Sequence, residues 1–207
     1  MKKMLVLLVV FMILPLSALS QNIKNIDFVS PFYDGLAAIE KDGEWAFIDE
    51  SGTIIIDYRN DVVLNRFGDD SYPVFNSGRC LIVKKEKGIS YFGFIDKEGK
   101  TVIEPQFLNA TSFNNEMAIV LQLHENVLGE NDLLDKRVIE YTYTKNVINT
   151  NGEAIMYLSE KPSHVTLSKD YLRVPPEIGA KFISNKLIAI KTDSGKWMIR
   201  RIDESNQ

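Results

Sequence analysis

The sequence predicts an all-β fold: a degenerate array of antiparallel β-hairpin or meander repeats, open or irregular rather than closed into a barrel, with little helix. Short runs rich in Ile, Val, Phe, Tyr and Trp alternate with Gly-containing turns, which is typical of β-strands and hairpins. One pattern recurs at a spacing of roughly 50 residues, a period that suits a multi-strand unit. Beyond the N-terminal segment, no 11-residue window keeps the 3.6-residue period of an amphipathic helix.

The first half of the repeat is an aromatic residue, a short turn and an apolar run. Its clearest copy is residues 32–39, FYDGLAAI, and further copies begin at Phe75, Phe113 and Phe182. Each copy therefore predicts a strand, a tight turn and a second strand.

The second half is an aromatic, a small residue, an aromatic, then Ile-Asp-x-x-Gly and another apolar run. It is complete at residues 45–52 and 92–99, reduced at 147–152, and cut short at 195–199. An Asp or Asn side chain can bond the backbone ahead of it, and Gly can take the left-handed conformation that closes a three-residue loop with a bulge. The expected turn residues of the repeats are Gly43, Asp49, Gly52, Asp96, Gly99, Asn149, Gly152 and Gly195.

These halves define one β-repeat domain over residues 21–207, because a lone hairpin is marginally stable and neighbouring units must stack. Two irregular insertions are expected, a polar loop over 123–137 and a Pro-containing segment over 159–181. The sequence allows a short helix over 130–136, and an edge strand over 171–174. The four units span approximately residues 28–58, 72–107, 110–157 and 180–203.

The N-terminus predicts export. Lys2 and Lys3 precede an apolar run over 4–16, and small residues follow at 17–20, so residues 1–20 have the pattern of a signal peptide cut after Ser20. An uncleaved anchor is the alternative, but the apolar run is shorter than the roughly 20 residues of a bilayer span. We therefore expect a periplasmic or extracellular protein with no membrane span once the signal is removed.

The charge and the single cysteine exclude two further classes. Removal of Lys2 and Lys3 leaves the processed chain near a net charge of −6, which disfavours binding to nucleic acid. Cys80 is the only cysteine, so an intramolecular disulfide is excluded. Because Cys80 begins an apolar strand pattern, we expect a buried thiol.

The repeat resembles the WG (or KWG) β-repeat family, whose units carry Gly-Leu-Ala, then Gly-Lys-Trp-Gly-aromatic-Ile-Asp, then Gly-Lys and Val-Ile-Pro. The resemblance is good over residues 28–121, and Gly195-Lys196-Trp197 keeps the central motif in the last unit. No copy has an intact Trp-Gly, since Ala46 and Met198 follow the two tryptophans. The resemblance implies an interaction or structural array, found in bacterial and often exported proteins, rather than an enzyme.

No catalytic, cofactor or metal site is predicted. His124 and His164 lie far apart in the expected insertions, without further ligands at metal-binding spacing. Asp69 and Asp70 lack the regular oxygen spacing of a calcium loop. Asp49 and Asp96 are better explained as turn residues, because Asn149 stands at the same place in the third unit.

The aromatic residues divide into core and candidate surface. Strand alternation places Phe47 and Phe94 in the core, whereas Trp45 and Trp197 form the candidate interaction surface. The sequence thus favours a non-enzymatic interaction or structural module of the bacterial envelope, binding an unknown protein or envelope polymer. A carbohydrate-binding or weakly hydrolytic domain is the alternative, for which exposed aromatics beside two facing carboxylates would be the sign. A spacer without any ligand is the third hypothesis.

Overall fold

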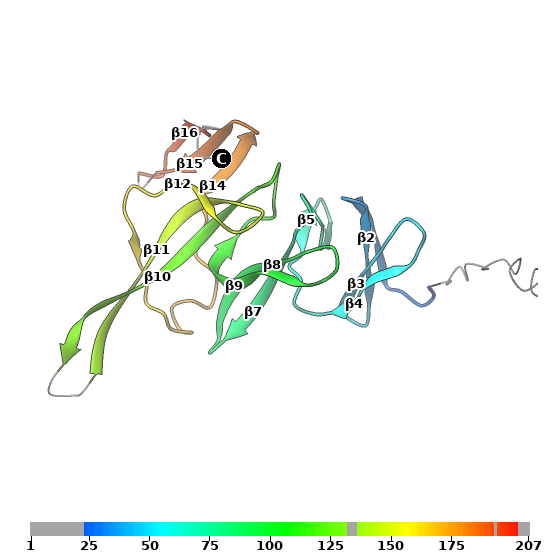
Figure 1. Ribbon diagram of the computed structural model, residues 1–207, viewed down its shortest axis with the longest axis horizontal. Coiled ribbons are helices and arrows are strands. Elements are labelled where there is room, and N and C mark those ends of the chain that lie inside the picture. Colours follow the sequence, from blue (N-terminus) through cyan, green and yellow to red (C-terminus); the bar gives the residue numbers. More distant parts are fainter. Residues whose placement is uncertain (1–22, 132–135, 193, 203–207) are drawn as a thin grey trace, which may run out of the picture.

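The computed structural model describes residues 23–131, 136–192 and 194–202, so the predicted signal peptide lies outside the described residues. The described residues are all-β, contain no helix, and form antiparallel sheets of which none closes into a barrel, as predicted. The repeat units follow one another along the long axis, from the blue N-terminal sheet to the orange C-terminal sheet (Figure 1). In this part of the chain, no helix has the length and hydropathy needed to cross a membrane.

The first unit is a four-stranded meander in the order β1-β2-β3-β4. Its first two connections are two-residue turns, Asp34-Gly35 and Asp42-Gly43, in which both residues have positive φ. Turns of this primed type match the right-handed twist of the flanking strands, which explains the Asp-Gly pairs in the sequence. The strands are β1 (Phe28–Tyr33), β2 (Leu36–Lys41), β3 (Glu44–Ile48) and β4 (Ile54–Arg59).

The second and third units merge into one seven-stranded sheet, in the order β12-β11-β10-β9-β8-β7 with β13 paired to β11. A small hairpin of β5 (Asn65–Phe67) and β6 (Asp70–Tyr72) precedes it. The strands of the large sheet are β7 (Cys80–Glu86), β8 (Ile89–Ile95), β9 (Thr101–Ala110), β10 (Met117–Asn131), β11 (Lys136–Asn149), β12 (Ala154–Tyr157) and β13 (Ser163–His164).

The last unit is a three-stranded sheet of β14 (Ala180–Ser184), β15 (Leu187–Lys191) and β16 (Trp197–Arg201). Its register repeats that of the first unit, because Ile199 lies opposite Ala189 as Phe47 lies opposite Ala38. The turn before Trp197 is one residue longer than the turn before Trp45, with Thr192 N–H donating to the Lys196 carbonyl across three residues.

The predicted irregular insertion over 123–137 is wrong. Residues 123–131 belong to β10 and residues 136–137 to β11, and the two strands form a long hairpin that extends from the sheet (Figure 1). Residues 125–129 and 137–138 of this extension are all exposed, so it lacks the alternation between a buried and a solvated face that identifies a half-buried strand. The predicted short helix over 130–136 is also wrong, because residues 130, 131 and 136 are in strands. Residues 132–135 lie outside the described part of the chain.

The segment over 159–181 is largely irregular, as expected, but the edge strand over 171–174 is wrong. A turn occupies this place, in which Leu172 N–H donates to the Ser168 carbonyl. Leu172 is buried with Val165 in a core cluster, whereas Tyr171 is exposed. The only strand within the segment before Ala180 is β13, which adds to the edge of β11.

The hydrophobic core is divided among the joints between units rather than gathered at one centre. The first cluster joins the first sheet to Phe75, Cys80 and Ile95 of the second unit. The second cluster joins β7–β9 to the third unit, and the third cluster joins β10–β12 to the last sheet. Consecutive units therefore bury apolar residues against each other at each joint, as in a solenoid.

Candidate functional site

The two tryptophans of the candidate surface lie in opposite environments. Trp45 is 6% exposed and belongs to the first core cluster, where it makes an edge contact with Phe28. The hypothesis that Trp45 forms an exposed interaction surface is therefore wrong, because the second unit covers it. Trp197 is 53% exposed, and the Lys181 ammonium lies 5.2 Å from its ring centroid.

The predicted Asp and Asn turn residues hold the repeat turns. The Asp49 Oδ1 atom accepts hydrogen bonds from the Ser51 hydroxyl and from the backbone N–H groups of Ser51 and Thr53. The Ser51 hydroxyl bond contributes most to lowering the pKa of Asp49, followed by the backbone bond from Thr53. Asp96 and Asn149 accept the equivalent backbone bonds, so these side chains stabilise loops.

The turn glycines also contact the neighbouring unit. Gly99 packs against Ile56 of the first unit, and Gly152 packs in the same way against Ile103 of the second unit. Both glycines have φ near +80°, which L side chains rarely adopt. The other predicted turn glycines, Gly43, Gly52 and Gly195, also have positive φ and have open space around them.

A second column of turns is joined from unit to unit by hydrogen bonds. The Asp34 carboxylate accepts from the Gly78 N–H at 2.6 Å, and the Ser77 hydroxyl accepts from the Glu116 N–H at 2.9 Å. Asp34 and Ser77 occupy the same turn position in successive units, so one contact is repeated. The Asn115 amide continues the column by donating to the Asn185 side-chain oxygen of the last unit. We call these four turn residues and their partners the turn ladder.

A groove of about 560 Å³ lies beside the turn ladder and spans three units. Phe67 of the β5–β6 hairpin lines it on one side and packs on Tyr33, with ring centroids 5.4 Å apart. The Ser112 hydroxyl donates to the Asn65 side-chain oxygen at 2.8 Å, which ties this hairpin to the start of the third unit. The groove is lined by Tyr33, Asp34, Phe67, Asn76, Ser77, Phe113, Asn114 and Asn115.

The aromatic wall of this groove is fixed by its own contacts. Tyr72 stacks on Phe67 at 4.6 Å between centroids, and its hydroxyl lies 3.1 Å from that of Tyr33. The hydrogen bond to Tyr33 and burial raise the pKa of Tyr72 to about 12, so the Tyr72 phenol stays neutral at physiological pH. At the floor, Phe113 is buried against Phe94. The groove is thus a preformed surface of aromatic rings and uncharged amides, with Asp34 as its charged group.

A second cavity, of about 640 Å³, lies between the 158–163 segment and the last sheet. Three of its charged residues hold neighbouring segments together: Lys191 lies 3.6 Å from Glu177, and Lys145 donates to the Gly179 carbonyl. These contacts join the 177–179 segment to β11 and β15, which is a structural role.

The two histidines are placed on strands rather than in loops. His124 lies in β10 and its Nε2 is 2.8 Å from the Thr144 hydroxyl, while His164 in β13 lies 3.5 Å from the Glu140 carboxylate. Within the described ranges, no three His, Cys, Asp or Glu side chains gather in a group that could hold a metal ion.

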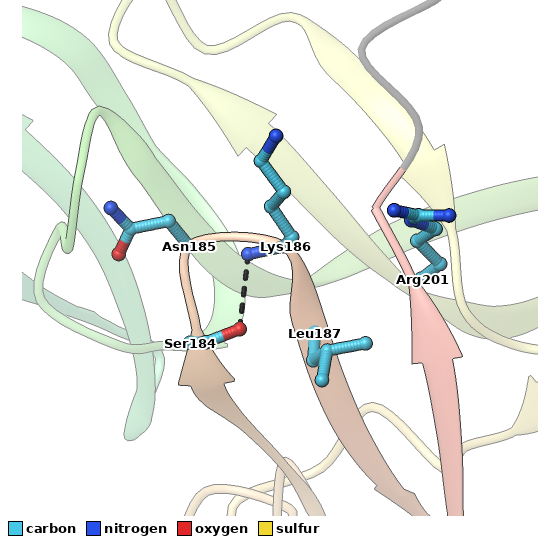
Figure 2. Close-up of a pocket in the computed structure, with 5 residues that line it drawn as sticks. All are labelled: Ser184, Asn185, Lys186, Leu187 and Arg201. Carbon is cyan, nitrogen blue, oxygen red and sulfur yellow. Dashed lines mark hydrogen bonds between the residues drawn. The ribbon is translucent and has the colours of Figure 1, made fainter.

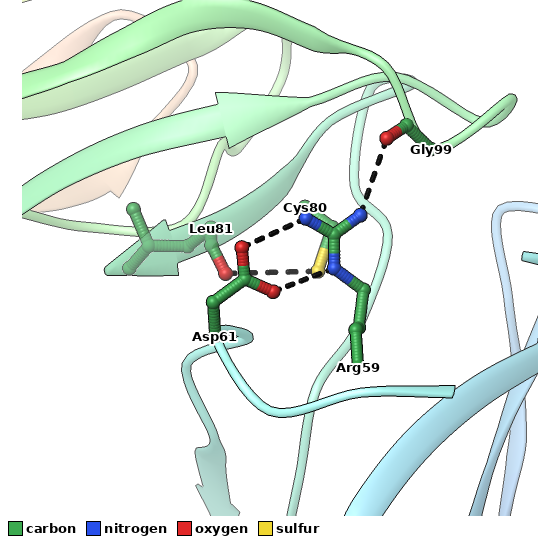
Figure 3. Close-up of polar contacts among 5 residues, drawn as sticks. All are labelled: Arg59, Asp61, Cys80, Leu81 and Gly99. Carbon is green, nitrogen blue, oxygen red and sulfur yellow. Dashed lines mark hydrogen bonds and ion pairs between the residues drawn. The ribbon is translucent and has the colours of Figure 1, made fainter. Parts of the chain in front are cut away.

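Cys80 lies at the joint between the first two units, near an ion pair (Figure 3). Arg59 binds both Asp61 oxygens, at 2.6 and 2.8 Å, and also donates to the Gly99 carbonyl of the second unit. Burial raises the pKa of the Cys80 thiol to about 12, although the Arg59 charge opposes the shift. The expectation of a buried thiol is confirmed, and the side chain is a core residue.

The turn ladder and its groove are the functional candidate that sequence reasoning missed. The sequence predicted a tight turn after each opening aromatic residue, but each turn was treated as a local feature of its own hairpin. The signal that could have found the ladder is the recurrence of a short side-chain acceptor at this repeat position, in Asp34, Ser77, Asn115 and Asn185.

Comparison with known proteins identifies the repeats. The family model described as WG containing repeat matches residues 24–45 and 92–122. The first match spans β1, β2 and the start of β3, and the second runs from β8 through β9 into β10. The expected resemblance to the WG repeat family is confirmed at these two regions. A search of curated proteins and a search of solved structures found no match.

Proposed function

We propose that this chain is an exported, non-enzymatic repeat scaffold of the bacterial envelope that binds a protein partner. The partner's binding site is the groove beside the turn ladder, and the bound element is an extended polypeptide segment. The observation that carries the proposal is the composition of this groove from three successive units and the β5–β6 hairpin.

The chemistry of the groove suits an extended peptide. Tyr33 and Phe67 offer an aromatic surface held in place by stacking, which gives contact area at low entropic cost. Asn76 and Asn114 offer side-chain amides that can both donate to and accept from a peptide backbone. A row of such groups along several repeats is how repeat arrays build an elongated binding surface.

Export is supported by the sequence alone, through the apolar segment over 4–16 and the small residues before Gln21. The non-enzymatic role is supported by the use of the turn carboxylates. Asp49 and Asp96 bind loop backbone groups, and the only cysteine is buried with a raised pKa. The charged residues near the groove are likewise in structural pairs, since Lys97 lies 2.9 Å from Asp34.

The test is a pull-down from envelope extract with the processed chain as bait, repeated with groove variants. Phe67→Ala removes the exposed ring of the groove wall, and Asn114→Asp places a charge among its amides. Tyr171→Ala is the matched control, because Tyr171 is an exposed aromatic on the 159–181 segment, away from the groove.

A protein retained saturably by the natural chain and by Tyr171→Ala, but lost with both groove variants, supports the proposal. Hydrogen exchange on the purified complex then has to slow at residues 113–117, beside the groove. A partner captured equally by all four baits, or slowed exchange confined to another face, overturns the groove as the binding site. Circular dichroism of each variant verifies that the fold is retained.

A further inference from the structure

The burial of equivalent residues changes at the two ends of the array. The aromatic residue that opens each unit is buried at Phe75 and Phe113 but 47% exposed at Phe32 in the first unit. Phe94 and Val147 occupy the position of Phe47 in the second and third units and are buried. Ile199 occupies it in the last unit and is 62% exposed. Each end of the described array therefore exposes a residue whose equivalents in the second and third units are buried.

Inside the chain, these two positions are each other's partners. Phe47 of the first unit packs edge-to-face on Phe75 of the second, with centroids 4.9 Å apart. Phe94 packs in the same way on Phe113 of the third unit, at 4.7 Å. At the third joint, Val147 shares a core cluster with Phe182. The two positions thus meet edge-to-face at the first two joints and share a core cluster at the third.

The exposed face of the last sheet continues the same pattern. Strand alternation places Leu187, Trp197 and Ile199 on one face, and all three are exposed. The equivalent residues of the first unit, Leu36, Trp45 and Phe47, are buried beneath the second unit. The last sheet therefore exposes these three apolar residues beside Lys191 and Arg201 of the same face, with no following unit within the described residues.

The turn ladder also ends at this face. A pocket of about 550 Å³ is formed by the turn over 184–186 together with Leu187 and Arg201 (Figure 2). Leu187 and Arg201 are paired across β15 and β16, on the face of Ile199. In the interior of the array, the turn of the following unit lies beside this position, as Gly78 lies beside Asp34.

We propose that a second copy of this chain docks head-to-tail on this face, with Phe32 of one copy packed against Ile199 of another. The occupant is argued from the three internal joints: this pair of positions is buried at the first two, and at the third Val147 is buried while Phe182 is partly buried in the same cluster. The exposed first sheet offers Val29 and Phe32 on one face, which are the residues that a preceding unit would cover. Such a heterologous contact gives a ring if its rotation closes and a filament if it does not.

The experiment measures the mass of the processed chain by analytical ultracentrifugation over a range of concentrations. The natural chain is expected to form species larger than a dimer as the concentration rises. Phe32→Glu places a charge on the contact surface of the first sheet, and Ile199→Glu places one on that of the last sheet. Either variant alone is expected to be monomeric. An equimolar mixture still holds one intact end of each kind, so it is expected to give a dimer of one copy of each variant.

Leu128→Glu is the matched control, because Leu128 is a large exposed apolar residue on the β10–β11 hairpin, far from both ends. It is expected to associate like the natural chain. Monomeric natural chain at all soluble concentrations overturns the proposal. So does a natural dimer that survives in either end variant, or an equimolar mixture that stays monomeric. These readouts need no partner protein, so they are independent of the proposed peptide groove.

Discussion

Phe47 and Phe75 meet edge-to-face, with their ring planes at 79° and their centroids 4.9 Å apart, although 28 positions separate them in the chain. Phe47 lies on the core face of the first sheet, and Phe75 is the aromatic residue with which the repeat pattern of the second unit begins. Phe94 and Phe113 repeat the relation one unit later. Because each contact joins only consecutive units, the stability of the chain is expected to reside in the joints.

Substitution of the opening aromatic residue is expected to depend on its unit. Phe113→Ala should lower the free energy of unfolding by about 3–5 kcal/mol, because it leaves a cavity at a buried joint. Phe32→Ala should change it by less than about 0.5 kcal/mol, since the ring is half exposed at the open end. Urea denaturation followed by circular dichroism measures both values. Equal losses for the two variants would show that burial at the joints does not control stability.

The sequence predicted the repeats and their turns well, but not which repeat residues are covered. Trp45 and Trp197 occupy the same motif position, and composition alone treats them alike. Their exposures differ because the unit of Trp45 has a following neighbour, whereas that of Trp197 has none among the residues that the structure describes. Local periodicity reports which face of a strand a residue lies on, whereas burial also depends on what packs against that face.

The β10–β11 hairpin was missed for a related physical reason. Strand prediction relies on alternation between a buried and a solvated face. Beyond Gln122 the two strands extend from the sheet as a ribbon, and residues such as Glu125 and Asn126 can face water on either side. The turn ladder was missed because hydrogen bonds between units leave only a short polar residue as their trace in the sequence.

The two tryptophans should respond differently to a soluble quencher. Trp45→Phe leaves Trp197 as the single tryptophan, and Trp197→Phe leaves Trp45. Acrylamide should quench the fluorescence of the first variant strongly and that of the second weakly, because Trp45 is 6% exposed. In denaturant the two variants should be quenched alike. Strong quenching of Trp45 in the folded protein would contradict its burial beneath the second unit.

Cys80 should be unreactive in the folded protein. Its thiol is buried and its pKa is raised to about 12, so the reactive thiolate is scarce near neutral pH. A thiol reagent such as Ellman's reagent should label it only after denaturation. Cys80→Ala should cost only about 1 kcal/mol, because Ala37 and Ala118 occupy the equivalent position in the first and third units.

The same thiol should contribute to the loss of stability in base. The folded pKa lies above the ordinary value of 9.0, so the folded state keeps the proton that the unfolded chain releases. The stabilisation is therefore complete below pH 9 and is lost as the pH rises toward 12. Cys80→Ala should unfold with a weaker pH dependence above pH 9, as urea midpoints would measure. Tyr72, whose pKa is also raised, retains its own contribution above pH 10 in both proteins.

Gly93 stands at the second position of the Trp-Gly motif, and its backbone surroundings explain why the second unit keeps glycine there. A Cβ atom on Gly93 would lie 2.4 Å from the Ile103 carbonyl oxygen and 2.6 Å from the Pro105 nitrogen. The bulge in β9 causes this approach: Phe94 pairs with Ile103 but Phe92 with Phe107, so three residues occupy a place where a regular ladder has one. In the first unit, only two residues lie between the partners Ile56 and Arg59, and Ala46 is accommodated.

Gly93→Ala should therefore lower the free energy of unfolding by about 1–3 kcal/mol, because backbone rather than a flexible side chain must move. Ala46→Gly is the matched control and should cost only about 0.5–1 kcal/mol, through the added freedom of the unfolded chain. Urea denaturation compares the two. A Gly93→Ala protein as stable as the natural chain would mean that the bulge can relax, and that glycine at this position is not required by the close approach of β8 and β9.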